Sequence, residues 1–224
     1  MVENGTVVNL AEASAGNRFF VGIAVGGNTA VSTLNFAASS TAGTVYLQNT
    51  GNYGFRVGHQ NNALHAGGII NIYDGVSFQS KANIWGQGTN THMLNIYNGS
   101  LSFVRDMAGQ SGSGGSTTGA AGLLHDMTVV LGMNGDLFIA GLNLADTNAF
   151  NTFLTSNGKS ILMDSSLGAE YSLVYQNGAS VTDAVSGASI NGVRISVIPE
   201  PSTYAFASVL AAGFVLAAIR RRRN

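Results

Sequence analysis

The sequence predicts an all-β protein with a right-handed parallel β-helix (a β-solenoid) as its body and a single C-terminal transmembrane helix. Three observations lead to this prediction: a strand-and-turn motif that returns after 24 residues, a composition rich in Gly and poor in charge, and an uncharged apolar segment near the end of the chain. A β-sandwich or β-barrel is the alternative for the body, because Asn-Gly and Asp-Gly turns also join hairpins.

The composition limits the classes of protein and of partner. The 224 residues suffice for one or two domains with a core. Only 9% of residues are charged, against roughly 25% in an ordinary globular protein. The absence of Cys excludes disulfides and thiolate metal sites. Without the last 27 residues the chain is net acidic, which argues against nucleic acid as a partner because that partner requires a basic patch.

The repeat is clearest in the first half of the chain. The stretch INIYDG at residues 70–75 returns as LNIYNG at residues 94–99, and each copy is followed by a second short apolar run. Apolar and polar residues alternate, so Ile70 and Ile72 face one way and Asn71 faces the other. Stacked copies would bury an interior of Ile, Val, Leu and Phe, with a ladder of recurrent Asn along one corner.

Four segments follow from this pattern: solenoid repeats over residues 1–109, a Gly/Ser/Thr loop or linker over 110–122, C-terminal strands and a cap over 123–197, and a tail over 198–224. Within the third segment we expect strands at 127–131, 136–139, 171–175 and 193–197, and a short helix within 144–154.

The tail contains an apolar span and then a basic cluster. Residues 204–219 carry no charge, and a helix over 202–219 is about 27 Å long, close to the roughly 30 Å of a bilayer core. The largest apolar side chains of this predicted membrane anchor are Tyr204, Phe206, Leu210, Phe214, Leu216 and Ile219. The arginines Arg220, Arg221, Arg222 and Arg223 then form a cytoplasmic stop by the positive-inside rule.

Just before this span lie the only two prolines of the chain, Pro199 and Pro201, on either side of Glu200. Each proline fixes its own φ angle and biases the residue before it towards extended conformations. Residues 198–201 are therefore predicted to form a stiff, non-helical, exposed strip just outside the membrane. An enzyme that binds extended peptides can read such a strip.

The order VIPEPSTYAF, apolar helix and RRRRN closely resembles the PEP-CTERM sorting signal of exported proteins from Gram-negative bacteria that also make exopolysaccharide. The resemblance covers residues 197–224. It implies a membrane-anchored precursor sorted at the inner membrane by an exosortase, which recognises Pro199, Glu200 and Pro201. It also implies a mature form at the cell surface or in the extracellular matrix, with exopolysaccharide as a possible partner.

Two further comparisons concern the N-terminal part. The repeats in residues 1–104 loosely resemble the passenger-like repeats of bacterial autotransporter and adhesin β-helices. The first 20 residues contain neither a basic region nor an apolar stretch of a signal peptide. Because an exosortase substrate must be exported, there are two explanations: export without a standard signal, or, as we expect, a sequence that is a fragment or has a false start.

Few residues suggest chemistry. The four His are scattered without metal-ligand spacing, and no catalytic residue, metal site or cofactor is predicted. Three aromatic residues, Tyr73, Trp85 and Tyr97, are possible glycan contacts. Tyr73 and Tyr97 occupy equivalent repeat positions, so a stacked ladder that stabilises the sheet is the preferred interpretation.

Two functions remain. The first is a structural or adhesive protein of the cell surface or exopolysaccharide matrix. The alternative is a secreted β-helix polysaccharide lyase or hydrolase, which would bring Arg56, Lys81 or Arg105 together with Asp74 on one sheet.

Overall fold

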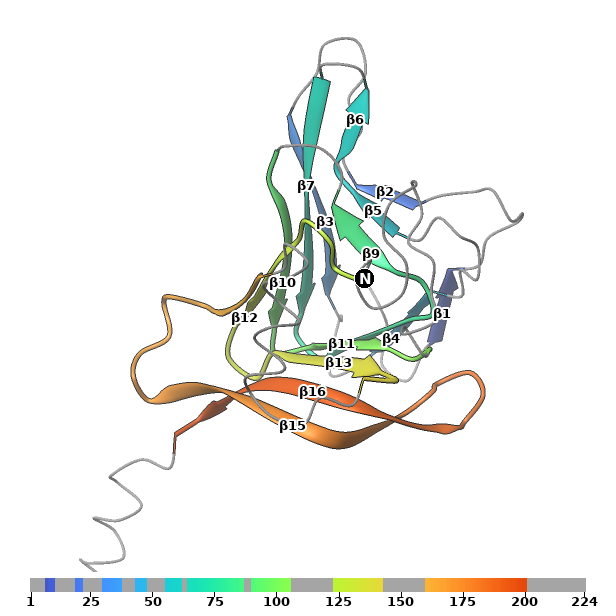
Figure 1. Cartoon of the computed structure of the whole chain (residues 1–224), viewed down its shortest axis with the longest axis vertical. Helices are drawn as coiled ribbons and strands as arrows, with labels where there is room; N and C mark the ends of the chain where they lie inside the picture. The colour runs from blue at the N-terminus through green and yellow to red at the C-terminus, as the bar shows by residue number, and fades with distance from the viewer. Residues whose placement is uncertain are drawn as a thin grey trace, which may run out of the picture.

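The computed structural model describes residues 7–10, 19–21, 30–37, 43–47, 55–61, 64–86, 90–105, 123–142 and 160–200. These residues are all-β, with strands and turns and no helix (Figure 1). No helix suited to crossing a bilayer occurs among them. The predicted helix within 144–154, the linker over 110–122 and the predicted membrane span all lie outside the described residues.

The strands lie in three sheets. The first sheet has the order β1 (Val7–Leu10), β4 (Gly43–Leu47), β8 (Val76–Ser80), β11 (Ser100–Phe103), β13 (Asp136–Ala140), β16 (Ser189–Pro199) and β15 (Tyr171–Thr182). The second sheet has the order β14 (Ser160–Met163), β12 (Thr128–Leu131), β10 (His92–Tyr97), β7 (Leu64–Tyr73) and β3 (Val31–Ala37), and β6 (His59–Asn61) pairs antiparallel with β7. The third sheet contains β2 (Phe19–Val21), β5 (Phe55–Val57) and β9 (Ile84–Gly86).

The chain visits the sheets in turn and places successive repeats side by side. From β7 in the second sheet it passes to β8 in the first, β9 in the third, and back to β10 in the second. Neighbouring strands of successive repeats are parallel, with Ile70 opposite Leu94 and Phe78 opposite Leu101. The Asp-Gly turn after β7 therefore joins two sheets and makes no hairpin. None of the three sheets closes on itself within the described residues.

The core fills the space between the inward faces of the three sheets. The predicted alternation is confirmed for β7, where Ile70 and Ile72 are buried and Tyr73 is half-buried. The same alternation runs through β10, whose Leu94 and Ile96 are fully buried. Other fully buried members are Leu47, Val57, Val76, Leu101, Phe103, Val129, Leu131, Leu137 and Ile139. The three sheets thus share one apolar interior.

The Asx-Gly turns form a corner between the second and first sheets. Asp74 and Asn98 have φ angles of 47° and 48°, as the sequence predicts for tight turns. Gly75 also lies in this left-handed region, whereas Gly99 does not. Gly99 is instead needed for space, because a Cβ there would be 3.0 Å from the Val76 carbonyl oxygen.

The C-terminal strands are longer than predicted and form a hairpin. β15 and β16 pair antiparallel, and β16 also pairs antiparallel with β13 (Figure 1, orange). The hairpin continues the first sheet beyond β13 and also covers part of its outward face, where Phe138 and Ala140 of β13 cluster with Ala179 of β15. Because most of β15 is exposed, its sequence lacks the regular apolar alternation that marked the other strands.

Candidate functional site

The predicted sorting motif begins at the end of β16. Ile198 is 41% exposed, Pro199 and Glu200 are also exposed, and none of them is helical, which agrees with the predicted strip. The strip is nevertheless paired along one side. Pro199 lies opposite Tyr171, and the Glu200 N–H donates a hydrogen bond to the Glu170 carbonyl oxygen at 2.6 Å.

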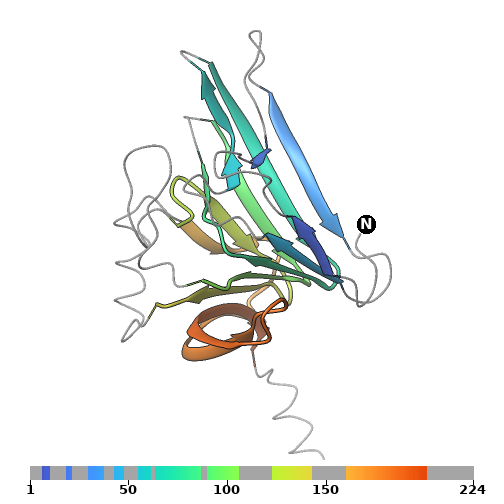
Figure 2. The same cartoon turned by 90° about the vertical axis from the view of Figure 1, so that its right-hand side faces the viewer.

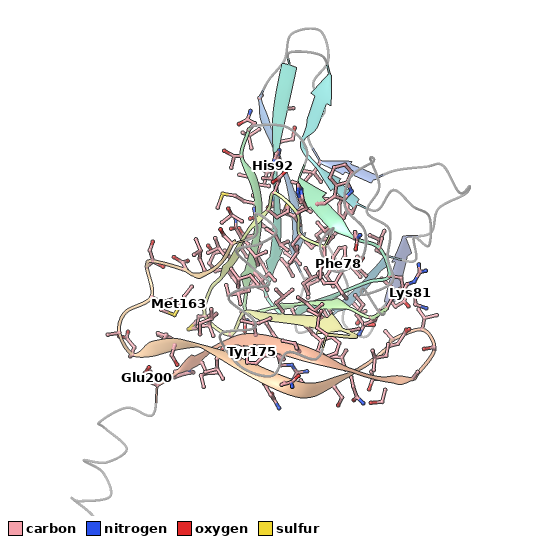
Figure 3. The ribbon with its side chains drawn as sticks, in the orientation of Figure 1. Phe78, Lys81, His92, Met163, Tyr175 and Glu200 are labelled. Atoms are coloured by element: carbon pink, nitrogen blue, oxygen red, sulfur yellow. The ribbon has the colours of Figure 1, made fainter. Side chains whose placement is uncertain are left out.

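Figure 3 labels Glu200 at the end of the hairpin, where the described chain stops. Pro201, the apolar anchor residues and the arginine cluster lie outside the described residues. The described part of the motif is therefore an exposed strand end that β15 holds in an extended conformation.

An asparagine ladder crosses the outward face of the second sheet. The Asn71 side-chain amide donates to the Asn35 side-chain oxygen at 2.7 Å, and the Asn95 amide donates to the Asn71 oxygen at 2.7 Å. The register places these three residues side by side on β3, β7 and β10. The sequence predicted such a ladder at a corner, but it lies within the strands, because the corner positions require the left-handed backbone of Asp74 and Asn98.

A tyrosine stack lies two residues further along the same face. The rings of Tyr73 and Tyr97 are stacked with centroids 5.6 Å apart and an interplanar angle of 21°. Just after the neighbouring strand β12, a Cβ at Gly132 would lie 3.0 Å from the Tyr97 Cγ and closer still to other ring carbons. The Tyr97 ring is therefore enclosed between Tyr73 and the Gly132 backbone.

Hydrogen bonding extends this stack to one more strand. Burial raises the pKa of Tyr97, and a hydrogen bond between its hydroxyl and the Asp164 carboxylate raises it further. Hydrogen bonds from Ser166, whose N–H lies 2.8 Å from Asp164 Oδ1, lower the pKa of Asp164, and Tyr97 adds to this effect. The ring faces and the hydroxyl of Tyr97 thus contact other residues of the protein. This favours a role in stabilising the sheet over a role in stacking on sugars.

The third aromatic residue lies elsewhere. Trp85 is half-buried on β9 in the third sheet, opposite Arg56 of β5. Tyr73 and Tyr97 belong to the second sheet. The three predicted glycan contacts therefore do not share one sheet.

Sequence analysis missed a buried polar cluster, the hairpin clasp, made of Tyr46, Gln79, Lys81 and Asp183. The Tyr46 hydroxyl lies 3.0 and 3.1 Å from the two Asp183 carboxylate oxygens, and Lys81 Nζ lies 3.4 Å from Oδ2. Gln79 donates to the Thr182 carbonyl at 2.9 Å and accepts from the Ala184 N–H at 2.8 Å. In Figure 3, Lys81 lies beside the tip of the hairpin.

The turn that follows Asp183, together with Tyr46 of the clasp, holds Asp183 in its charged form. Burial acts to raise the pKa of Asp183, but hydrogen bonds from the Val185 and Ser186 N–H groups and from Tyr46 outweigh it and lower the pKa to about 2. Tyr46 and Asp183 are 137 residues apart in the chain. A contact between residues so far apart leaves no local pattern in the sequence. The only indication in the sequence was Asp183 itself, because Asp is common in turns.

Of the basic residues that the enzyme hypothesis names, Lys81 and Arg105 lie away from Asp74. Asp74 precedes β8 and Lys81 follows it, so they lie at opposite ends of this strand, and Lys81 is paired with Asp183. Arg105 follows β11, whose end lies beside the Lys81 end of β8. The Arg56 side chain is outside the described part of the chain.

The histidines give no metal site in the described part of the chain, where no group of three His, Asp or Glu residues is placed to hold an ion. His92 is buried, with Nδ1 3.2 Å from the Asp126 carbonyl oxygen. His125 Nδ1 lies 3.0 Å from the Asp126 carboxylate. The side chains of His59 and His65 lie outside the described residues.

A shallow groove of about 300 Å³ follows the Asx-Gly corner. It is lined by Gly75, Val76, Ser77, Asn98, Gly99, Ser100, Asn134 and Asp136. Burial raises the pKa of Asp136, while Arg194 Nε at 3.4 Å and the Ser196 hydroxyl at 3.0 Å act to lower it. The groove thus presents one paired carboxylate among amides and hydroxyls, whereas most glycosidases use two carboxylates.

Comparisons of the chain with protein-family models, with curated proteins and with solved structures give no match. The sorting signal and the adhesin-like repeats therefore rest on the residues quoted above.

Proposed function

We propose that this chain is an exported structural or adhesive protein of the cell surface or exopolysaccharide matrix. Its body is a parallel β-solenoid that serves as a rigid spacer or contact surface. Its C-terminal segment is a PEP-CTERM sorting signal, with the PEP motif as the recognition sequence for an exosortase, the apolar span as the membrane anchor and the arginine cluster as the cytoplasmic stop.

The side-by-side placement of equivalent repeat residues supports the solenoid most directly. The Asn35, Asn71 and Asn95 amides bond in series, and Tyr73 stacks on Tyr97. Such contacts arise where each repeat packs on the next in one direction, as in a solenoid. These contacts connect each repeat to the next and do not form a catalytic site. A structural spacer is expected to have such contacts.

The exposed end of β16 supports the sorting signal. Ile198 to Glu200 is extended, and it lies at the boundary between the described body and the apolar span. A membrane-embedded enzyme needs its recognition sequence directly beside the bilayer and outside the compact core. Pro199 and Glu200 are exposed at the end of the described body, and in the sequence they shortly precede the predicted apolar span, which supports this role.

The test is the intact mass of the mature protein from its native host, with both terminal peptides sequenced. We expect a C-terminus near residues 199–202 and loss of Arg220 to Arg223. A Glu200→Ala variant should keep its tail and collect in the inner-membrane fraction, whereas a matched Glu170→Ala variant should mature normally. An intact tail on the wild-type chain would overturn the sorting proposal.

A second measurement tests the function of the body. Purified protein should bind to or remain with exopolysaccharide from the host while releasing no new reducing ends and no unsaturated sugar products. Time-dependent release of either product would replace the structural proposal with the enzyme.

A further inference from the structure

Four Asn-Gly steps lie in the described part of the chain, at residues 98–99, 134–135, 177–178 and 191–192. The asparagine is exposed in all four. Asn is a thermolabile residue, and a following glycine makes it more so, because the glycine backbone nitrogen can reach the Asn side-chain carbon Cγ without interference from a Cβ. This approach requires the peptide unit between the two residues to turn. The fold therefore decides which of the four steps reacts.

Two of these steps hold their glycine inside the structure. The Gly135 N–H donates a hydrogen bond to the Gly132 carbonyl oxygen at 2.9 Å, so its nitrogen is engaged in the turn. Gly192 is buried in β16, between β13 and β15, and a Cβ there would collide with the Ile139 carbonyl oxygen. Neither glycine nitrogen can approach the preceding asparagine without breaking these contacts.

The step at the corner is held through its asparagine. The Asn98 N–H donates to the Met133 carbonyl oxygen at 2.8 Å, and the Asn98 carbonyl oxygen accepts from the Gly75 N–H at 2.6 Å. The asparagine backbone is thus bonded to the repeat on either side. Gly99 is also enclosed, since a Cβ there would meet the Val76 carbonyl oxygen at 3.0 Å.

The fourth step lies at a β-bulge in β15, the outer strand of the C-terminal hairpin (Figure 2, orange). The ladder with β16 passes from Asn177 opposite Val193 to Ala179 opposite Gly192, and it leaves Gly178 without an opposite residue. Gly178 is exposed with a φ angle of 70°, and a Cβ there would meet nothing within 4 Å. Because a bulge interrupts the ladder locally, the Gly178 nitrogen has room to approach the Asn177 side chain.

The chain offers an internal comparison for this step. Asn177 and Gly178 line a pocket of about 340 Å³ together with Asn191 and Gly192. Both Asn-Gly steps therefore meet the same solvent at the same pH. The difference between them is the glycine, which is buried between two strands at residue 192 and has open space around it at residue 178.

We propose that Asn177 is a deamidation site that reacts ahead of the other three described Asn-Gly steps. The Gly178 nitrogen gives up its proton to solvent base and bonds to the Asn177 Cγ. The side-chain nitrogen takes up a proton, its bond to Cγ breaks, and ammonia leaves. Water then opens the resulting five-membered succinimide. Cleavage of the bond between Cγ and the Gly178 nitrogen gives aspartate, and cleavage at the Asn177 main-chain carbonyl carbon gives isoaspartate.

The isoaspartate product lengthens the backbone of β15 by one carbon atom, between the ladder at Val193 and the hairpin tip. The clasp contacts at this tip, from Tyr46 to Asp183 and from Gln79 to Thr182, require the strand to keep its length. We therefore expect modified molecules to lose the clasp and to unfold at a lower urea concentration than unmodified ones.

Peptide mapping of the full chain in detergent micelles, kept in mildly alkaline buffer, tests the proposal. Mass spectrometry separates aspartate and isoaspartate from unreacted asparagine at each step. We expect residue 177 to convert several-fold faster than the other three. An Asn177→Gln variant should lose this conversion, because glutamine would have to form a larger ring. Asn191→Gln, on the neighbouring strand of the same pocket, is the matched control and should leave conversion at residue 177 unchanged.

The same experiment in concentrated urea separates the effect of the fold from that of the local sequence. The excess at residue 177 should disappear there, because the unfolded chain no longer holds the other glycines in place. Faster conversion at residue 98, 134 or 191 in the folded chain would overturn the proposal, as would no conversion at residue 177. An excess at residue 177 that persists in urea would assign the selectivity to its sequence neighbours and exclude the bulge as its cause.

Discussion

The role of an asparagine in this chain depends on its position in the repeat. Within β7, Asn71 has an extended backbone, and its side chain both donates and accepts in the ladder. At the corner, Asn98 adopts a φ of 48°, a conformation that Asn tolerates better than most residues. The same residue type therefore stabilises the sheet through its side chain at one position and through its backbone at the other.

Gly132→Ala should destabilise the protein because the new methyl group has no room under the Tyr97 ring. Overpacking of this kind costs about 1–3 kcal/mol. Urea unfolding followed by circular dichroism measures the change in the free energy of unfolding. In a Tyr97→Ala background the same substitution should cost much less, because the ring that it meets is gone. Equal costs in both backgrounds would show that the stack does not set the requirement for glycine.

At the scale of elements, the β15–β16 hairpin is attached to the rest of the fold in two ways. Near β13 it forms backbone ladders and a small apolar cluster around Phe138. At its tip, the clasp fastens Asp183 to Tyr46 and Lys81 on β4 and after β8. The tip is thus held by charge and hydrogen bonds, which makes its attachment sensitive to pH.

Asp183→Asn should remove a pH-dependent part of the stability. The pKa of Asp183 is about 2 in the folded chain, against about 3.9 when unfolded, which corresponds to about 2 kcal/mol. Because the folded pKa is the lower one, this contribution is present above about pH 5 and is lost as the pH falls towards 2.

Urea titrations at several pH values measure this loss. The difference in unfolding free energy between wild type and Asp183→Asn should shrink steadily between pH 5 and 2. A pH-independent difference for Asp183→Asn would contradict the role of the carboxylate charge.

At the scale of the whole molecule, stability should vary along the direction in which strands stack. The strands β8, β10 and β11 have paired neighbours on both sides and a buried inward face. Among the described strands, β3 is paired with β7 alone within its sheet. Elements at the end of a stacked array open more readily than those inside it.

Hydrogen exchange should show this gradient. Amides of β3 that do not face β7 should exchange fastest, and amides of β10 slowest. Strong protection of those β3 amides would mean that another strand covers this edge.

The sequence was informative where a local pattern reports the structure. Alternation in residues 70–73 and 94–97 identified the strands and their inward faces, and the Asx-Gly pairs identified the turns. The equivalence of Tyr73 and Tyr97 also predicted their stacking. These features depend on residues one to four positions apart, or on one repeat and the next.

The outward faces were harder to predict. Tyr46 occupies an outward position on β4 yet is completely buried, because the hairpin tip lies over it. Alternation distinguishes the two faces of a strand but does not reveal which outward face another element will cover. The clasp depends on contacts between segments more than 100 residues apart, and no period in the sequence encodes them.

Because of the hairpin, the two ends of the described body differ. The hairpin closes one end of the first sheet, and the chain leaves the described body there, at Glu200. If the following segment is anchored in a bilayer, the closed end faces the lipid and the β3 end points away from it. The anchored segment would then decide which end of the body lies next to the cell and which end meets the surroundings.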